Sequence, residues 1–429
     1  MIIGGVLKKN FKNTDVKLIK DINNSLLLKS YVVILSLYST LHIVDKNIKN
    51  LTEVLKNKNK NIKIYVGGPV SAYPSIILKE LNVDGVILGE GELTITDIIK
   101  GSSDEGLAYL ENDEIVINPN RKLPDLESED ILIPKDIGSQ NIRGANIYLE
   151  THRGCLGHCT FCQVPKFFGR NIRSKPLEVI IDQVKKLKKY GVKKVAVSGG
   201  TGSLYNFKKK LNKDMFLDLI EKLSSILGKN NLSIPDMRVD YVDEDILNGI
   251  RDYTIGWVFY GIESGSDKIL KDMKKGVSVE KNLNAIKLCR DCNVKVGGSF
   301  IVGYPTETET DYLLTKDFIV DAELDSVFVS IAEPIPTTEL CDLVLKTPID
   351  KNPSFIRDKG KYGRLGLTIS EGRCLDLSIH GNMWKPNPVI ITKKLFHTYY
   401  IESKKQGEDI RKITNLIYKY KSHLCENGF

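Results

Sequence analysis

The chain has 429 residues, 41% hydrophobic and 27% charged, a composition typical of a globular protein with several domains. No apolar run approaches the about 20 residues that span a bilayer, and residues 1–7 lack a basic leader, so we expect a cytoplasmic protein with no membrane partner. The net charge of +8 comes from 62 basic and 54 acidic residues. Since the two signs are interspersed, this charge favours a solvated basic surface over a nucleic-acid partner.

The first 118 residues combine strand and helix patterns. Apolar runs predict buried strands at 2–7, 31–37, 62–66 and 85–88. Helical spacing of apolar residues over 44–55 predicts a helix. Residues 1–118 are therefore predicted to form a small Rossmann-like α/β domain. Residues 119–145, with three prolines, are predicted to be a linker.

From residue 146 to 340 the two patterns alternate regularly. The predicted strands are 147–151, 194–198, 235–241, 255–262, 294–302 and 326–331. A helix between the first two begins after Pro176 and ends at Gly191. Six strand–helix units predict a partial (β/α)6 barrel with its active site at the carboxyl ends of the strands.

The last segment, 341–429, has a looser pattern. Residues 342–390 show no sustained periodicity, whereas the apolar residues between Ile410 and Tyr420 predict a helix over 407–423. We expect an α+β extension of the barrel.

Three cysteines, Cys155, Cys159 and Cys162, lie in the loop after the first barrel strand with the spacing CxxxCxxC. A 4Fe–4S cluster normally takes four thiolates, so three would leave one iron open to another ligand. The alternative is a zinc knuckle, for which His152 or His158 could supply the fourth ligand.

Four further cysteines predict a second metal site. Cys289 and Cys292 form a CxxC pair, and Cys341 and Cys374 follow at a distance. A tetrahedral site of this kind would hold iron or zinc and would pin residues 342–390 to the barrel. The alternative is that these cysteines are packing residues of the core.

The cysteine loop, from Arg153 to Cys162, resembles that of the radical S-adenosylmethionine (SAM) superfamily. Three glycine turns follow in that family's order: Val197-Ser198-Gly199-Gly200-Thr201, Tyr260-Gly261-Ile262-Glu263-Ser264-Gly265-Ser266-Asp267 and Phe300-Ile301-Val302-Gly303-Tyr304-Pro305-Thr306-Glu307. The resemblance implies an open cluster iron that binds SAM and a reductive cleavage that releases a 5′-deoxyadenosyl radical. It implies cofactor contacts from Phe161, Gly199, Gly200, Thr201, Arg238, Asp240, Glu263, Ser264 and Gly303. For Arg238 and Asp240, an ordinary polar layer of a barrel core is the alternative.

The N-terminal segments Val66-Gly67-Gly68-Pro69 and 83–92 resemble the cobalamin-binding fold that precedes many such barrels. The cobalt-ligating DxHxxG motif is absent, and we interpret His42 as a packed or capping residue. Because the N-terminal sheet is small, we predict that residues 342–429 form much of the cobalamin pocket against the barrel mouth.

Over its whole length the chain resembles the methanogenesis-marker radical SAM family, whose activity is C-methylation of an arginine in methyl-coenzyme M reductase. The resemblance implies a cobalamin-dependent radical SAM methyltransferase that methylates the δ-carbon of an arginine. Its substrate would be the alpha subunit of that reductase, or a peptide of it, and an electron donor would be a second partner. Tyr148, just ahead of the cysteine loop, is a candidate catalytic residue, with a core or surface tyrosine as the alternative.

Other functions remain open at this point. Methylthiotransferases carry a second cluster on N-terminal cysteines, and this chain has no cysteine before residue 155. Another radical SAM reaction, on a small molecule or an RNA, is the nearer alternative. A non-catalytic iron–sulfur module is the more distant one.

Overall fold

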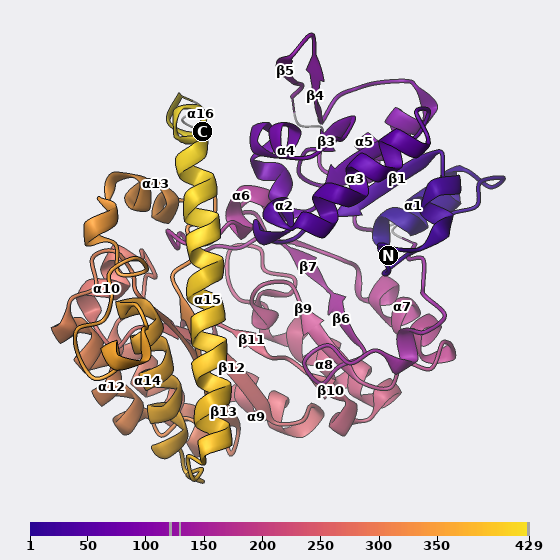
Figure 1. The fold of residues 1–429 in the computed structure, drawn as a ribbon. Coiled ribbons are helices and arrows are strands. Elements are labelled where there is room, and N and C mark those ends of the chain that lie inside the picture. The colour runs from indigo at the N-terminus through magenta and orange to yellow at the C-terminus, as the bar shows by residue number, and fades with distance from the viewer. Residues whose placement is uncertain (120–121, 128–129, 427–429) are drawn as a thin grey trace.

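The computed structural model describes residues 1–119, 122–127 and 130–426 (Figure 1). Its N-terminal part is a five-stranded sheet of order β1-β2-β3-β4-β5. Strands β1 (Val32–Ser36), β2 (Lys63–Gly67) and β3 (Gly85–Ile87) are parallel, as predicted, and an unpredicted hairpin of β4 (Leu107–Glu111) and β5 (Glu114–Ile117) extends them antiparallel. The helices are α1 (Ile2–Asn10), α2 (Leu41–Val44), α3 (Lys46–Lys58), α4 (Pro74–Glu80) and α5 (Glu92–Lys100), with 3-10 turns η1 (Ser25–Lys29) and η2 (Pro69–Ala72).

The prediction of a strand at residues 2–7 is wrong, because this segment forms helix α1. A short apolar run fits a strand or a buried helix equally well, and here packing decides. Ile3 and Leu7 pack with Ile95 of α5. A Cβ at Gly5 would lie 1.8 Å from the carbonyl oxygen of Asp130, so only glycine allows this close approach. The expected linker, 119–145, contains only the 3-10 turn η3 (Ile137–Ser139) among its described residues, and 120–121 and 128–129 lie outside them.

The barrel consists of parallel strands in chain order. One sheet is β10-β9-β6 and the next is β11-β12-β13-β14. The strands are β6 (Ile147–Glu150), β9 (Val195–Ser198), β10 (Leu232–Ser233), β11 (Asp236–Met237), β12 (Trp257–Glu263), β13 (Lys295–Val302) and β14 (Ser326–Ile331). Because β10 and β11 follow each other directly, they together occupy the third of six positions. The α/β class and the partial barrel are thereby confirmed, although the third strand starts earlier than predicted and is broken.

Helices cover the outer face of this sheet. They are α7 (Leu177–Lys189), α8 (Lys213–Leu227), α9 (Glu244–Tyr253), α10 (Asp267–Asp272), α11 (Val279–Asp291) and α12 (Glu309–Ala322). The shorter elements are α6 (Val164–Phe168), the β7 (His152–Arg153) and β8 (Arg173–Ser174) pair, η4 (Gly202–Leu204), η5 (Lys229–Asn231) and η6 (Val239–Tyr241). Helix α7 begins after Pro176, as predicted. The main core lies between these helices and the strands.

The C-terminal extension is helical in the part of it that the structure describes, so the α+β prediction is wrong there. It contains α13 (Glu339–Lys346), η7 (Ile349–Lys351), η8 (Gly363–Leu365), α14 (Ile369–Met383), α15 (Lys393–Lys419) and α16 (Lys421–Glu426). The predicted helix 407–423 is the second half of the longer α15 and the start of α16. None of the helices in the described ranges is both long and apolar enough to cross a membrane.

Helix α15 runs along the barrel and reaches the N-terminal domain (Figure 1). Midway along the helix, Gln406 pairs with the free edge of β14: its Nε2 donates to the Val329 carbonyl at 3.2 Å, and its Oε1 accepts from the Ile331 N–H at 3.1 Å. At its C-terminal end, Tyr420 donates to Glu80 of α4 at 2.7 Å. The helix therefore covers an open sheet edge, whose backbone groups need partners, and joins two parts of the molecule.

The second metal site is not supported. In the described ranges no three His, Cys, Asp or Glu side chains gather as ligands of one ion. Cys289 lies 3.2 Å from the Tyr260 hydroxyl, and Cys292 and Cys374 pack in the main core, whereas Cys341 belongs to a different cluster. Burial raises the pKa of Cys289 to about 12 and that of Cys374 to about 11, as expected for thiols packed in a core.

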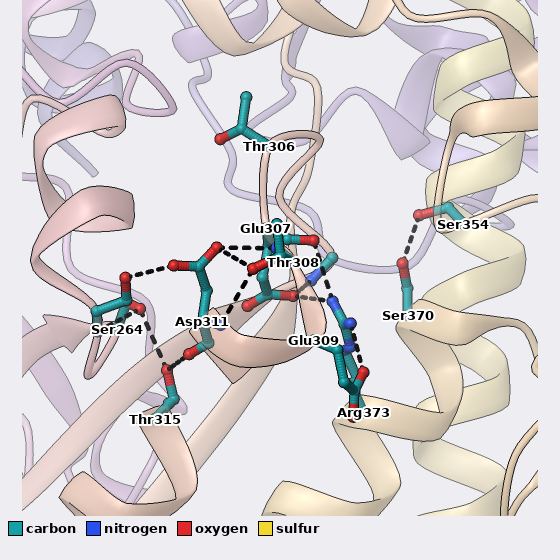
Figure 2. Close-up of polar contacts among 12 residues, drawn as sticks. Ser264, Thr306, Glu307, Thr308, Glu309, Asp311, Thr315, Ser354, Ser370 and Arg373 are labelled. Atoms are coloured by element: carbon teal, nitrogen blue, oxygen red, sulfur yellow. Dashed lines mark hydrogen bonds and ion pairs between the residues drawn. The ribbon is translucent and has the colours of Figure 1, made fainter. Parts of the chain in front are cut away.

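Buried polar contacts hold α14 against the barrel instead of a metal (Figure 2). Arg373 of α14 donates to Glu307 at 2.7 Å and to Glu309 at 2.8 Å, and its side chain is only 10% exposed. Glu307 in turn accepts from the Gly303 N–H at 2.9 Å. A Cβ at Gly303 would lie 2.2 Å from the Ser370 hydroxyl, so this glycine lets α14 approach the turn after β13.

We predict that Arg373→Ala will destabilise the fold strongly, because it leaves the buried Glu307 without its countercharge. Breaking a buried pair typically costs about 3–5 kcal/mol. Urea denaturation should show this loss, while the exposed Arg364→Ala control should change the free energy of unfolding by less than about 0.5 kcal/mol. Equal, small effects in both variants would contradict this role of the ion pair.

Candidate functional site

Two of the three cysteines in the loop after β6, Cys155 and Cys159, lie close to Gly157. The Gly157 N–H donates to Cys155 Sγ at 3.4 Å. A Cβ at Gly157 would lie 3.4 Å from Cys155 Sγ and 3.7 Å from Cys159 Sγ, so the glycine leaves room for both sulfurs. A 4Fe–4S cluster spreads its cysteines over separate irons, so they need not converge on one point. The absence of a single-ion ligand group among the described residues therefore argues against the zinc knuckle.

Two cations face these cysteines. Arg238 Nη1 lies 3.9 Å from Cys159 Sγ, and the same guanidinium makes a two-pronged pair with Asp240, at 2.9 and 2.8 Å. Burial raises the pKa of Cys159, and the charges of Lys275 and Arg238 act in the opposite direction. The cations therefore favour the thiolate form that binds iron. Arg238 and Asp240 were expected on the third strand, whereas both lie beyond the end of β11, beside and in the 3-10 turn η6.

Lys275 is a site residue that the sequence analysis missed. Its ammonium donates to Glu263 at 2.7 Å, and both side chains are 8% exposed. Glu263 has a φ of +68°, a conformation that side chains other than glycine adopt at a cost. A Cβ at Gly261 would lie 2.8 Å from Lys275 Nζ, so the glycine before Glu263 leaves space for the pair. No local sequence pattern distinguishes Lys275 from its neighbour Lys274, because the partner of Lys275 is Glu263, at the end of β12.

A cavity of about 410 Å³ opens beside the cysteine loop. It is lined by residues 156–158 of that loop, by Arg238, Asp240 and Tyr241, and by the turn at 274–276 together with Lys271. The lining carries more positive than negative charge, which suits an anionic group such as an amino-acid carboxylate. Its size is in the usual range for a small-molecule site.

The glycine pair after β9 lies at the base of the cysteine loop. A Cβ at Gly199 would lie 2.5 Å from the His152 ring, and one at Gly200 would lie 3.7 Å from the Gly154 carbonyl oxygen. Burial lowers the pKa of His152 to about 4, so its ring is neutral at pH 7. Thr201 is buried beside it. These three predicted residues are close to the loop but do not line the cavity, and their cofactor contacts stay predictions.

The structure places the other predicted residues elsewhere. Ser264 lies 3.2 Å from Thr315 in the network that joins the turn after β12 to α12 (Figure 2). Gly303 faces α14. Phe161 packs against the hydrophobic cluster that contains Tyr304 and Leu340. None of them lines the cavity, so their cofactor contacts are untested.

Tyr148 lies on β6, below the cysteine loop. Burial and the carboxylate of Asp236 raise its pKa, and Arg143 acts in the opposite direction. These neighbours place Tyr148 beside the start of β11, and its predicted catalytic role stays a prediction.

A buried charge network ties the cysteine loop to the N-terminal domain. Arg153, two residues before Cys155, is 3% exposed and pairs with Glu90, with Glu92 at 2.8 Å and with Glu150 at 3.0 Å. Glu90 also pairs with Arg173, which adjoins Arg153 across the β7–β8 ladder. Residues 89–92 belong to the segment that resembles the cobalamin-binding fold. Both of their glutamates thus pair with the arginine next to the cysteine loop.

We predict that Glu90→Gln will loosen the cysteine loop, because two arginines lose a shared countercharge. Losing one partner of a buried pair typically costs about 3–5 kcal/mol. Iron per chain after anaerobic gel filtration should fall severalfold, and the exposed Glu178→Gln control should keep its iron. Wild-type iron content in Glu90→Gln would refute this role of the network.

Comparisons with known proteins agree with this geometry. The family model described as the radical SAM superfamily matches residues 149–319. A Methanocaldococcus jannaschii protein named "Putative methylthiotransferase MJ0865" is 63% identical over 427 residues, which cover 99% of this chain and 94% of that protein. A tRNA-2-methylthio-N(6)-dimethylallyladenosine synthase of Bordetella avium is 25% identical over 69% of this chain and 61% of its own length.

Two solved structures share the fold. The radical SAM methyltransferase TsrM of Kitasatospora setae, solved with cobalamin and a [4Fe-4S] cluster, has a TM-score of 0.65 and 12% identity, and 96% of each chain is covered. The cobalamin-dependent SAM radical enzyme OxsB has a TM-score of 0.59 and 17% identity over 96% of this chain and 54% of OxsB. The sequence relationship and the arrangement of Cys155, Cys159 and Cys162 lead to one conclusion. The chain belongs to the radical SAM superfamily, whose cofactors are a 4Fe–4S cluster and SAM.

Proposed function

We propose that the protein is a cobalamin-dependent radical SAM methyltransferase that methylates carbon. One observation carries this proposal: the fold match to TsrM covers 96% of both chains and so includes the N-terminal sheet, the barrel and the helical extension. A likeness limited to the barrel would support only a SAM-cleaving enzyme.

The residues present fit the cofactors that such an enzyme needs. Cys155, Cys159 and Cys162 would hold the cluster, and Arg238 and Lys275 would orient the methionine carboxylate of SAM in the adjoining cavity. When bound, the cluster and SAM supply a 5′-deoxyadenosyl radical, and cobalamin supplies the methyl group. The protein's contribution is to hold the reacting groups close together and to exclude water.

For cobalamin, we propose the carboxyl edge of the N-terminal parallel strands, where ligands of open α/β sheets bind. This edge faces the barrel: η2 packs against α6, and α2 packs against α15. Tyr38, just after β1, is 70% exposed, and a Cβ at Gly89 would meet no atom within 4 Å, so the edge offers open surface. His42 packs its ring edge against Tyr38. This location differs from the prediction that residues 342–429 form much of the pocket; helix α15 packs against α2 at this edge and would supply part of the pocket.

Methylthio transfer is the second candidate, since relatives carry that name. The cysteine inventory argues against it, because no cysteine precedes residue 155 to hold an N-terminal cluster.

For the substrate, we propose the δ-carbon of an arginine in the alpha subunit of methyl-coenzyme M reductase, with an electron donor as the second partner. The likeness of the stretch from Asn146 to Cys155 to the methanogenesis-marker family supports this choice. An unactivated carbon has no acidic proton, so a cofactor radical suits it better than acid–base chemistry.

We predict that Cys155→Ala, Cys159→Ala and Cys162→Ala will each lose the iron–sulfur absorbance and the formation of 5′-deoxyadenosine, because each thiolate holds one iron. Anaerobic reconstitution followed by chromatographic product analysis checks this. Cys292→Ala, a core cysteine outside the loop, is the control and should keep both. Full turnover in any one of the three loop variants would refute the cluster assignment.

We predict that the reconstituted protein with cobalamin, a reductant and methyl-deuterated SAM will transfer a deuterated methyl group to an arginine carbon. The substrates are peptides that tile the arginines of the reductase alpha subunit, and tandem mass spectrometry locates the label. A sulfur-containing product would indicate methylthio transfer instead. Label only in an added RNA would contradict the protein substrate.

A further inference from the structure

The two faces of the barrel sheet differ in character. Leu149, Met237 and Tyr260 point to the helices and lie in the main core. Their strand neighbours Tyr148, Asp236 and Phe259 must point the other way, because successive side chains alternate between faces. These three inner residues do not belong to any hydrophobic cluster of the described chain. The concave inner face is therefore not filled by apolar packing at this level.

Strand register brings the inner residues to one level. Asp236 of β11 lies opposite Phe259 of β12, and Phe259 lies opposite Gly297 of β13. Gly297 in turn lies opposite Ser326 of β14. A Cβ at Gly297 would lie 2.7 Å from the Phe259 ring, so the ring lies flat against the sheet over that glycine. Phe328, two residues beyond Ser326 on the same face, is 53% exposed. Aromatic side chains thus lie on the same face of the sheet as this carboxylate.

The Asp236 carboxylate has no hydrogen-bond donor in the part of the chain that the structure describes. The charge of Arg143 acts to lower the pKa of Asp236, and the charge of Asp236 acts to raise the pKa of Tyr148. Burial raises its pKa, as expected for a carboxylate that lacks the partners it would have in water. A partly buried carboxylate among aromatic rings is a good site for a cation, and a guanidinium can both pair with it and stack on the rings.

The position also suits a substrate. Asp236 and Arg238 are two residues apart, which places them about 7 Å apart along the chain. Arg238 in turn contacts Cys159 at 3.9 Å. A group held at Asp236 would therefore lie on the barrel sheet, two residues before the arginine that contacts the cluster loop.

We propose that Asp236 is the specificity residue that binds the cationic, guanidinium-like end of the substrate side chain, with Tyr148 and Phe259 as its aromatic walls. This assignment rests on the proposed function and gives the substrate a chemical class: a basic side chain rather than a nucleobase. It also gives Tyr148 a binding role in place of the catalytic role predicted from the sequence.

Binding of small probes tests the assignment without catalysis. The full chain, loaded with its cluster and saturated with S-adenosylhomocysteine, is titrated with arginine amide, citrulline amide or guanosine and followed by calorimetry or ligand-observed NMR. Citrulline is the neutral counterpart of arginine, so the comparison isolates the charge. We expect arginine amide to bind at least about tenfold more tightly than citrulline amide, which equals about 1.4 kcal/mol.

Asp236→Asn keeps the size of the side chain and removes its charge, and it should abolish the preference for arginine amide. Asp252→Asn, at an exposed aspartate of α9, is the matched control and should keep it. Asp236→Asn should also keep the iron content and the thermal unfolding midpoint of the wild type, which separates a lost binding site from a damaged fold. A preference that survives in Asp236→Asn, or a tighter binding of guanosine than of arginine amide, would overturn the assignment. Failure of methyl transfer by the wild-type protein would instead count against the proposed function, since these titrations do not depend on it.

Discussion

The buried charge network around Arg153 is the constraint on which the site depends. A guanidinium that is 3% exposed loses its hydration, and the carboxylates of Glu90, Glu92 and Glu150 compensate for that loss. Two of these three come from the N-terminal domain and one from β6. The loop that carries the three cysteines therefore takes its position from both parts of the molecule. Without the N-terminal domain, this cation beside Cys155 would lose two of these three carboxylates.

Paired buried charges also position other strand ends of the barrel. Arg373 and Glu307 fix α14, Lys275 and Glu263 occupy the space over Gly261, and Arg238 and Asp240 present a cation to Cys159. Each pair joins segments that are separated in the chain or that meet at a strand end. Polar contacts of this kind give the strand ends a defined geometry. In the core, the close packing of apolar side chains has the same effect.

The sequence predicted the barrel well because its signals are local. Continuous apolar runs mark parallel strands that are buried on both sides or nearly so, and glycine turns mark their ends. Residues 2–7 were misread because a short apolar run does not distinguish a strand from a buried helix. Helix α14 was missed because several of its buried residues, among them Ser370, Glu371 and Arg373, are polar, so apolar periodicity does not reveal it.

Tertiary partners were the least predictable feature. The CxxC spacing of Cys289 and Cys292 suggested a metal, yet spacing along a helix says nothing about where Cys341 and Cys374 lie, and the fold buries them in separate places. Glu90 and Arg153 are separated by 63 positions, and no local pattern joins them. Such pairs follow from the docking of domains, which a single sequence does not specify.

The central claim is that a cobalamin cofactor works together with the radical SAM site. The most direct measurement is cobalamin content and reductive SAM cleavage in the same anaerobically purified, reconstituted full-length protein. The account predicts stoichiometric bound cobalamin together with formation of 5′-deoxyadenosine. A protein that cleaves SAM but retains no cobalamin would contradict the methyltransferase assignment, and one that holds its cluster without cleaving SAM would be an iron–sulfur module.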